Sequence, residues 1–250
     1  MKILLVRHAE PDYSIDSLTE KGRVEAELLS QRLARLPVRD FYVSPKGRAQ
    51  ATAEYTLRRV GRTAETLPWL AEFRGACNDP DTGKHRIAWD FRPRTWAAKP
   101  MLWSVDTWAD DPMFEGSNVK TVWEETKAGV DELLARYGYR KDGPVFRCDN
   151  NTGDTLVLFC HFAISMVIMG YLCDISPIVL LHRFAMQPSS VTTLITEERI
   201  KGEVSFRAMQ VGDISHLYAG DERWSTAGLF PEVYTGVDST DPPEWGQRKK

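Results

Sequence analysis

The stretch KILLVRHAEPD, residues 2–12, runs from an apolar segment directly into Arg7 and His8. A continuous apolar run is typical of a strand that is buried on both faces, as in a parallel sheet covered by helices. The stretch DTLVLFCHF, residues 154–162, repeats this pattern and places His161 directly after its apolar run. Two buried strands that each lead into a histidine predict an α/β fold whose sheet carries a functional edge.

The composition is ordinary for a globular protein. The 250 residues are 42% hydrophobic and 27% charged, and a chain of this length can bury a sizeable core. The net charge of -3 provides no basic field for nucleic acid or for an anionic membrane surface. The longest apolar stretch, around residues 156–172, is interrupted by His161 and Ser165 and is too short for a membrane span. We therefore expect a protein that binds neither nucleic acid nor membranes.

The cysteines favour a reducing environment. The chain has four of them, and their positions include no CxxC pair and no spacing typical of zinc ligands. Cys160 lies inside the second apolar run, where it is expected to be a small buried apolar side chain. No hydrophobic leader precedes the first predicted strand, which begins at Lys2. These features predict a cytoplasmic protein.

Helical and strand patterns alternate along the chain, as in α/β proteins. One helix is predicted at residues 18–36 with Thr19 as its N-cap, and another at residues 44–60 with Ser44 as N-cap and Pro45 in the first turn. The other predicted elements are helices at residues 119–138 and 162–172 and strands at residues 40–43, 189–198 and 203–211.

Two segments lack clear periodicity. Residues from about 75 to 118 are rich in Pro, Asp, Arg and Trp, and they predict an insertion or cap on a single domain that spans residues 1–250. The arginines and tryptophans of this insertion favour either a surface for a charged, flat or polyanionic substrate or a small core with a solvated rim. The tail from about residue 220 is irregular, with prolines and scattered aromatic residues.

The two histidines lie at the carboxyl ends of predicted strands, where open α/β sheets bind ligands. Neighbouring strands lie about 4.8 Å apart, so both imidazoles could face one small ligand. Arg7 adjoins His8, and Arg48 lies in the first turn of the helix predicted at residues 44–60. Guanidinium groups and helix N-termini both bind phosphate oxygens. Together these residues predict a phosphoryl site, whereas each histidine alone could equally be a buried residue with satisfied hydrogen bonds.

Four segments resemble the motifs of the histidine phosphatase superfamily, the phosphoglycerate mutase-like group with the RHG signature. LVRHAE at residues 5–10 is similar to that signature, and SPKGRAQATA at residues 44–53 is similar to the SPxxRAxQTA segment. TLPWLAEF at residues 66–73 resembles the stretch that supplies an acid, and LVLFCH at residues 156–161 resembles the strand that ends on the second histidine. The resemblance implies a three-layer α/β/α sandwich with a mostly parallel central sheet.

The resemblance also implies a mechanism through a phosphohistidine. His8 would be the nucleophile, and Arg7, Arg48 and His161 would bind the equatorial oxygens of the phosphoryl group during its transfer. Glu72 would protonate the leaving oxygen and then deprotonate the attacking water. We expect no metal, because no cluster of metal ligands is visible in the sequence, and no cofactor.

The chain departs from the family pattern at two glycines. Ala9 replaces the glycine after the first histidine, and Phe162 replaces the glycine that commonly follows the second, which would narrow the entrance to the site. Ser14, Arg74 and Phe162 are the candidate substrate-binding residues.

Three functions are open on these observations. The favoured one is a metal-independent phosphomonoesterase that acts on a small phosphorylated metabolite. A mutase would return the phosphoryl group to a sugar acid, but the ERHYG-like segment typical of mutases reads EFRGACN here, at residues 72–78. The third is a non-catalytic module that binds a phosphorylated ligand. Dimers are frequent in the family, so a homodimer is also open, and the sequence does not name the substrate.

Overall fold

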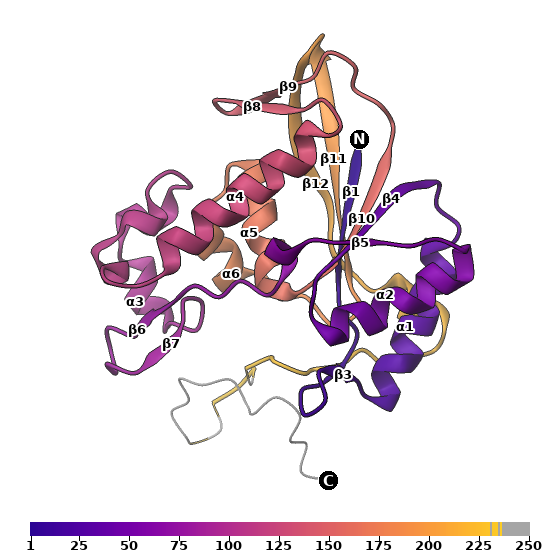
Figure 1. The fold of residues 1–250 in the computed structure, drawn as a ribbon. Coiled ribbons are helices and arrows are strands. Elements are labelled where there is room, and N and C mark those ends of the chain that lie inside the picture. The colour runs from indigo at the N-terminus through magenta and orange to yellow at the C-terminus, as the bar shows by residue number, and fades with distance from the viewer. Residues whose placement is uncertain (231, 235, 237–250) are drawn as a thin grey trace.

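A computed structural model describes residues 1–230, 232–234 and 236, and its centre is an eight-stranded sheet (Figure 1). The strands are β1 (Lys2–Arg7), β4 (Val38–Val43), β5 (Glu65–Thr66), β8 (Arg140–Asp142), β9 (Val145–Arg147), β10 (Thr155–Cys160), β11 (Val191–Ile200) and β12 (Glu203–Asp213). Their order across the sheet is β5-β4-β10-β1-β11-β12-β9-β8.

One half of the sheet is parallel and the other half is antiparallel. β10 pairs in parallel with β1 on one side and with β4 on the other, and β5 extends this half. β11, β12, β9 and β8 are then added in antiparallel pairs. The α/β fold is confirmed, but the sheet is mixed rather than mostly parallel. The reason is that hairpins extend it beyond β1, and a hairpin needs no crossover helix.

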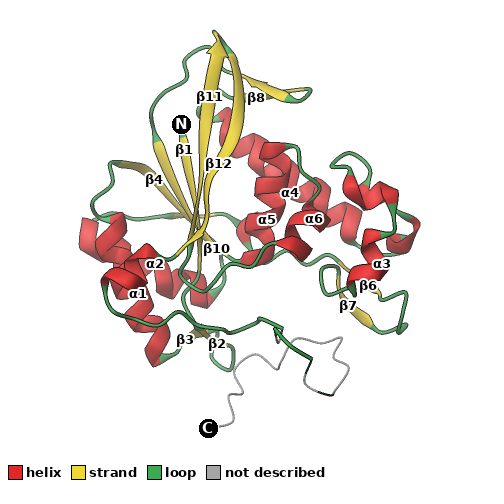
Figure 2. Cartoon of the chain, turned by 180° about the vertical axis from the view of Figure 1, so that it is seen from behind, coloured by secondary structure: helices red, strands yellow, loops and turns green. Residues whose placement is uncertain are grey.

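Helices cover both faces of this sheet, which confirms the three-layer arrangement. The helices of the described residues are α1 (Glu20–Leu33), α2 (Gly47–Val60), α3 (Pro93–Ala97), α4 (Val119–Ala135), α5 (Phe162–Cys173), α6 (Pro177–Arg183) and α7 (Ser215–Ala219), of which α3 belongs to the insertion. Figure 2 shows α1 and α2 on one side of the sheet and α4, α5 and α6 on the other. Within the described residues, no helix combines the length and apolar character needed to cross a membrane.

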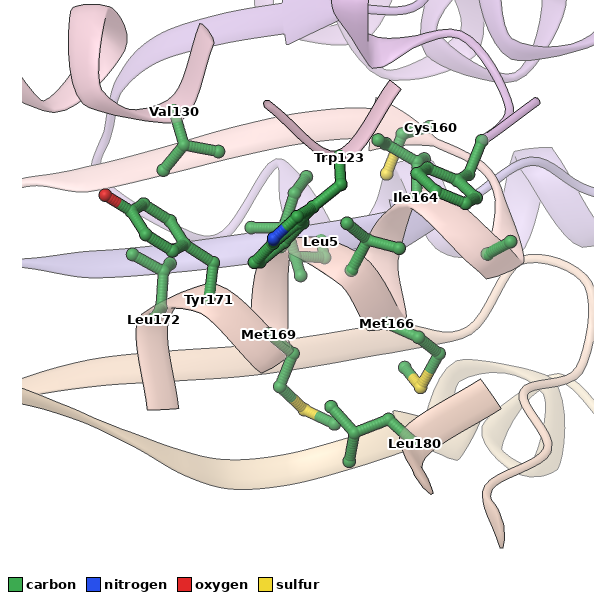
Figure 3. Close-up of a cluster of buried hydrophobic side chains, with 14 of the residues drawn as sticks. Leu5, Trp123, Val130, Cys160, Ile164, Met166, Met169, Tyr171, Leu172 and Leu180 are labelled. Carbon is green, nitrogen blue, oxygen red and sulfur yellow. The ribbon is translucent and has the colours of Figure 1, made fainter. Parts of the chain in front are cut away.

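The strand β1 serves two apolar clusters because successive side chains point to opposite faces. Leu4 and Val6 pack with the buried residues of α1 and α2, whereas Ile3 and Leu5 belong to the larger cluster with α4 and α5. Figure 3 shows part of that larger cluster, in which Cys160 is one of the labelled side chains. Burial raises the pKa of the Cys160 thiol to about 12, as expected for a small buried side chain.

The predicted helix N-caps have different outcomes. Thr19 caps α1, and its hydroxyl accepts a hydrogen bond from the amide of Gly22 at 3.0 Å. The prediction for Ser44 is wrong, because α2 begins at Gly47 and its N-cap is Lys46. Ser44 is fully buried directly after β4, and its hydroxyl hydrogen-bonds to the His161 imidazole and also accepts from the amide of Lys46 at 3.2 Å, ahead of the helix.

The insertion contains short elements of its own and packs on the main core. Its elements are β6 (Ala76–Asn78), β7 (His85–Ile87), α3, and 3-10 turns at Pro100–Trp103, Trp108–Asp110 and Pro112–Phe114. Trp96 and Trp108 are buried within the larger apolar cluster, whereas Trp103 is 48% exposed. This arrangement favours the small-core interpretation of the insertion. Residues 220–230 of the tail form no helix or strand, and its remainder lies largely outside the described residues.

Candidate active site

His8 follows β1 directly and is held in a single tautomer. Its Nδ1 lies 2.8 Å from the carbonyl oxygen of Ala9. A carbonyl can only accept, so Nδ1 carries the proton and the Nε2 lone pair stays available. Burial, followed by the neighbouring His161 and Arg7, lowers the pKa of His8 well below its usual value. The imidazole is therefore neutral at neutral pH, which is the state a nucleophile requires.

His161 meets His8 at the edge where the two parallel strands end. The register pairs Arg7 with Cys160, and the two imidazole centroids lie 5.1 Å apart. His161 Nε2 lies 2.7 Å from Ser44 Oγ, and the buried Nδ1 has no hydrogen-bond partner. Burial, followed by Arg48 and Arg7, lowers the pKa of His161 to about 2. The prediction that the two rings lie close together is confirmed, and that they face one ligand stays a prediction.

The two arginines reach the histidines from different elements. Arg7 is the last residue of β1, and its guanidinium donates to the carbonyl of Met186. Arg48 lies in the first turn of α2 and donates from Nη1 to Asp16 Oδ1 at 2.6 Å. The Nε of each arginine is buried without a hydrogen-bond partner in the protein. Buried donors normally have acceptors, so these groups fit an anionic ligand.

Glu72 is positioned by the start of α5. Its Oε1 accepts hydrogen bonds from the amide of Ile164 at 3.1 Å and from the amide of Phe73 at 3.0 Å. Burial raises the pKa of the Glu72 carboxyl, although the Ile164 amide and the Arg7 guanidinium oppose that shift. A carboxyl with a raised pKa stays protonated to a higher pH than an exposed carboxyl does, which suits a group that gives up a proton and takes it back.

The structure adds a turn that the sequence analysis missed. Between β2 (Pro11–Asp12) and β3 (Ser17–Leu18), the chain brings Tyr13 and Asp16 to the arginines. Arg48 Cζ lies 5.3 Å from the centroid of the Tyr13 ring. Asp16 accepts from the amide of Gly47 at 2.9 Å as well as from Arg48.

Gly47 is the residue from which the sequence could have indicated this contact between the turn and α2. A Cβ on Gly47 would lie 2.2 Å from the carbonyl oxygen of Asp16, so only glycine permits the turn to approach α2 this closely. Asp16 itself has a left-handed backbone, with φ of 46°. Glycine at a predicted helix start can therefore indicate close packing by another segment.

The candidate substrate-binding residues lie in different surroundings. Phe162 is the first residue of α5, and its ring centroid lies 6.0 Å from Arg7 Cζ. Ser14 is exposed, and its hydroxyl donates to Asp12 Oδ1 at 2.5 Å. Arg74 is exposed, two residues beyond Glu72. Phe162 thus contacts a predicted phosphate-binding residue, whereas the roles of Ser14 and Arg74 stay predictions.

Ala9 fits the site without crowding it. Its methyl group is fully buried and packs in a small apolar cluster with Leu18 and Ala26. Its amide donates to Thr52 Oγ1 at 3.0 Å, which ties the residue after His8 to α2. The side chain that replaces the family's usual glycine is therefore accommodated by neighbouring small residues.

A cavity of about 570 Å³ lies away from the histidines, between α4 and the β8–β9 hairpin. Its three lysines already have acidic partners, in the pairs Lys120–Asp110, Lys127–Glu124 and Lys141–Asp174. The buried Nε groups of Arg7 and Arg48, which have no hydrogen-bond partner, belong instead to the histidine site, which is therefore the candidate active site. Across the described part of the chain, no group of three or more His, Cys, Asp or Glu side chains could hold a metal ion.

Comparisons with known proteins agree with this geometry. The model of the histidine phosphatase superfamily (branch 1) matches residues 3–207. A comparison with curated proteins gave no match. A phosphoserine phosphatase mutant from Entamoeba histolytica, solved in complex with phosphoserine, has a TM-score of 0.57 and 17% identity, and the match covers 86% of this chain and 98% of that one.

Two further solved structures are similar in fold. The mycobacterial glucosyl-3-phosphoglycerate phosphatase has a TM-score of 0.54 and 17% identity, with 83% of this chain and 96% of that one covered. The Bacillus stearothermophilus protein YhfR has a TM-score of 0.53 and 20% identity, with 86% and 98% covered. At these identities the likeness shows the fold, whereas the family match shows descent. The chain belongs to branch 1 of the histidine phosphatase superfamily.

Proposed function

We propose that this protein hydrolyses a small phosphorylated metabolite through a phosphohistidine formed at His8. The observation that carries the proposal is the state of His8, which is a neutral imidazole with its Nδ1 proton committed to Ala9 and its Nε2 lone pair available. The buried Nε groups of Arg7 and Arg48 stand nearby without acceptors in the protein. Phosphatases among the similar structures and the family match support the same activity class.

In the first step, the Nε2 lone pair of His8 attacks phosphorus as the bond from phosphorus to the substrate oxygen breaks. Glu72 gives its proton to that oxygen, which leaves as an alcohol. The hydrogen bond from Nδ1 to Ala9 then keeps the ring in place and stabilises the charge that develops on it. The carboxyl of Glu72 is left ionised.

In the second step, ionised Glu72 takes a proton from water while the water oxygen attacks phosphorus. The bond between phosphorus and His8 Nε2 breaks, and inorganic phosphate leaves with the nucleophile restored. Glu72 has then recovered the proton that it gave up, so the two steps form a closed cycle. The guanidinium forks of Arg7 and Arg48 offset the charge on the equatorial oxygens in both steps, and His161 can contribute as a neutral donor.

We also propose that residues 1–250 form one domain with residues 75–118 as its insertion. The support is that Trp96 and Trp108 of the insertion share an apolar cluster with Leu5 of β1. Metal independence and a cytoplasmic location stay proposals from the sequence.

Trapping the phosphoenzyme tests the proposal. Acid-labile, base-stable label from a radioactive phosphate ester should appear on the wild-type protein within one turnover and should be absent from His8→Ala. Turnover of p-nitrophenyl phosphate distinguishes a phosphatase from a non-catalytic binding module. Phosphate release that is independent of 2,3-bisphosphoglycerate distinguishes a phosphatase from a mutase. Turnover without any labelled histidine would overturn the proposed intermediate.

A further inference from the structure

An aromatic ring accompanies each arginine of the proposed phosphate site. Phe162 lies beside Arg7, with 6.0 Å between the ring centroid and Cζ, and Tyr13 lies beside Arg48 at 5.3 Å. The two rings come from different elements, since Phe162 begins α5 and Tyr13 belongs to the turn between β2 and β3. Neither residue has a role in the two proposed steps.

Tyr13 lies beside Arg48, among the charged groups of the site. Burial raises the pKa of Tyr13, and the charges that act on this phenol are those of Arg7, Arg48, Glu72 and Asp16. Glu72 is the proposed acid, so the alcohol that leaves must be close to its carboxyl. The Tyr13 residue is still 42% exposed, which places it at the mouth of the site.

Asp16 adds a negative charge at the same mouth. Its carboxylate is held by Arg48 and by the amide of Gly47, and 46% of its side chain is exposed. Its hydrogen bonds to Gly47 and Arg48 keep the pKa of Asp16 below its usual value despite partial burial. The group is therefore ionised at neutral pH, and it opposes a second anion on the substrate.

We infer that Tyr13, Asp16 and Phe162 form a selective rim that favours phosphate esters of flat, uncharged alcohols over esters whose alcohol carries a carboxylate. The inference rests on the proposed phosphatase activity. Aromatic faces stack on a flat alcohol, and each such contact changes affinity by about two- to tenfold. Repulsion between two partly exposed carboxylates changes it by about two- to fivefold.

Three alkyl phosphates separate these effects. Benzyl phosphate, glycerol 3-phosphate and 3-phosphoglycerate each release an alcohol whose alkoxide is a poor leaving group. Each reaction therefore needs the proton from Glu72. Because kcat/KM reports the steps up to phosphorylation, it measures selection of the leaving alcohol. We expect kcat/KM to fall from benzyl phosphate to glycerol 3-phosphate and again to 3-phosphoglycerate. Glycerol 3-phosphate differs from 3-phosphoglycerate by the carboxylate, and benzyl phosphate differs from both by its ring.

Variants of the rim should change these ratios in separate ways. Phe162→Gly should lower the preference for benzyl phosphate over glycerol 3-phosphate by about two- to tenfold, and Phe162→Leu, which keeps apolar volume without a flat face, should lower it less. Asp16→Asn keeps the side chain's size and should raise the rate ratio of 3-phosphoglycerate to glycerol 3-phosphate by about two- to fivefold. Asp106→Asn, an exposed aspartate of the insertion, is the charge control and should leave both ratios unchanged.

The outcomes distinguish the inference from the function on which it rests. Absence of turnover with all three esters and with p-nitrophenyl phosphate would contradict the phosphatase itself. Turnover with equal or reversed preference, or ratios that Phe162→Gly and Asp16→Asn leave unchanged, would overturn the selective rim while the phosphatase stands. Ratios of kcat/KM between esters are compared because Asp16→Asn also weakens the ion pair with Arg48. That loss would reduce the rate with every ester alike.

Discussion

Two regions of this molecule bury charged side chains, and they do so in different ways. In the insertion, Arg86 and Asp79 form an ion pair at 3.3 Å, and Asp79 also accepts from the amide of Asp81 at 2.8 Å. At the ends of β1 and β10, the buried Arg7 donates to the carbonyl of Met186 rather than to a carboxylate, and the buried Nδ1 of His161 has no hydrogen-bond partner. Burial of charge alone therefore does not identify a site. A buried cation whose charge no carboxylate offsets, beside a second unpartnered nitrogen at adjoining strand ends, points to an anionic ligand because that ligand can recover the free energy of burial.

The largest expected effect comes from removing the nucleophile. His8→Ala should reduce turnover by more than about 10³-fold, because no other side chain can accept the phosphoryl group. Circular dichroism and the melting temperature should show that the variant is folded. Residual activity above a few per cent in purified protein would place the phosphohistidine elsewhere. The ends of β1 and β10 would then no longer differ from the insertion in carrying the reaction.

Loss of the proposed acid should depend on the substrate. Glu72→Gln should slow phosphorylation by an alkyl phosphate by about 10²–10⁴-fold, and by much less with p-nitrophenyl phosphate, whose leaving group needs no proton. Single-turnover measurements are required because Glu72 also serves the second step with both substrates. Equal losses with the two substrates would assign the acid to another residue.

The raised pKa of Glu72 gives this prediction a pH dependence. The acid works when protonated, so phosphorylation by the alkyl phosphate should decline as pH rises through the raised pKa. The sign follows from burial, which favours the protonated form and moves the decline to a higher pH than for an exposed carboxyl. Glu72→Gln should flatten this limb of the profile.

Replacement of Arg48 by another cationic residue tests whether its guanidinium binds the phosphoryl group. Arg48→Lys keeps the charge but loses the planar fork, so we expect kcat to fall and KM to rise, with kcat/KM reduced by about 10²-fold. Steady-state kinetics with p-nitrophenyl phosphate measures both constants. If both constants matched those of the wild type, Arg48 would lie outside the binding site.

A substitution in the insertion should change the stability of the protein rather than its turnover. Arg86→Met leaves the buried Asp79 carboxylate without its ion-pair partner, which should lower the free energy of unfolding by about 3–5 kcal/mol. Urea denaturation measures that change, and kcat/KM of the folded protein should change less than about threefold. A large rise in KM without loss of stability would instead make the insertion a substrate-binding surface.

Chelation is expected to have the smallest effect. The proposed chemistry uses a histidine, a carboxyl and guanidinium groups, so prolonged treatment with EDTA should leave turnover unchanged. Activity that EDTA removes and Mg²⁺ or Zn²⁺ restores would show a metal requirement.

Much of the fold could be predicted from local patterns. The apolar runs at β1 and β10, the period of α4, and the Thr19 cap all depend on residues close in sequence, and the structure confirms them. The five proposed reacting and binding residues also stand in recognisable motifs, and the structure brings Arg7, His8 and His161 to one edge of the sheet. Local chemistry sufficed there because strand ends and helix starts place a side chain by themselves.

Tertiary structure decided the contacts between distant segments. Hairpin pairing made half of the sheet antiparallel, and the buried hydroxyl of Ser44 forms a hydrogen bond with the His161 imidazole from the end of a distant strand. The turn with Tyr13 and Asp16 contacts Arg48 at the start of α2. A polar side chain pairs with whichever group packing brings near it, and that group is set by the arrangement of the whole chain. Residue patterns therefore determined which groups could react, and packing determined their protonation, their partners and the rim around them.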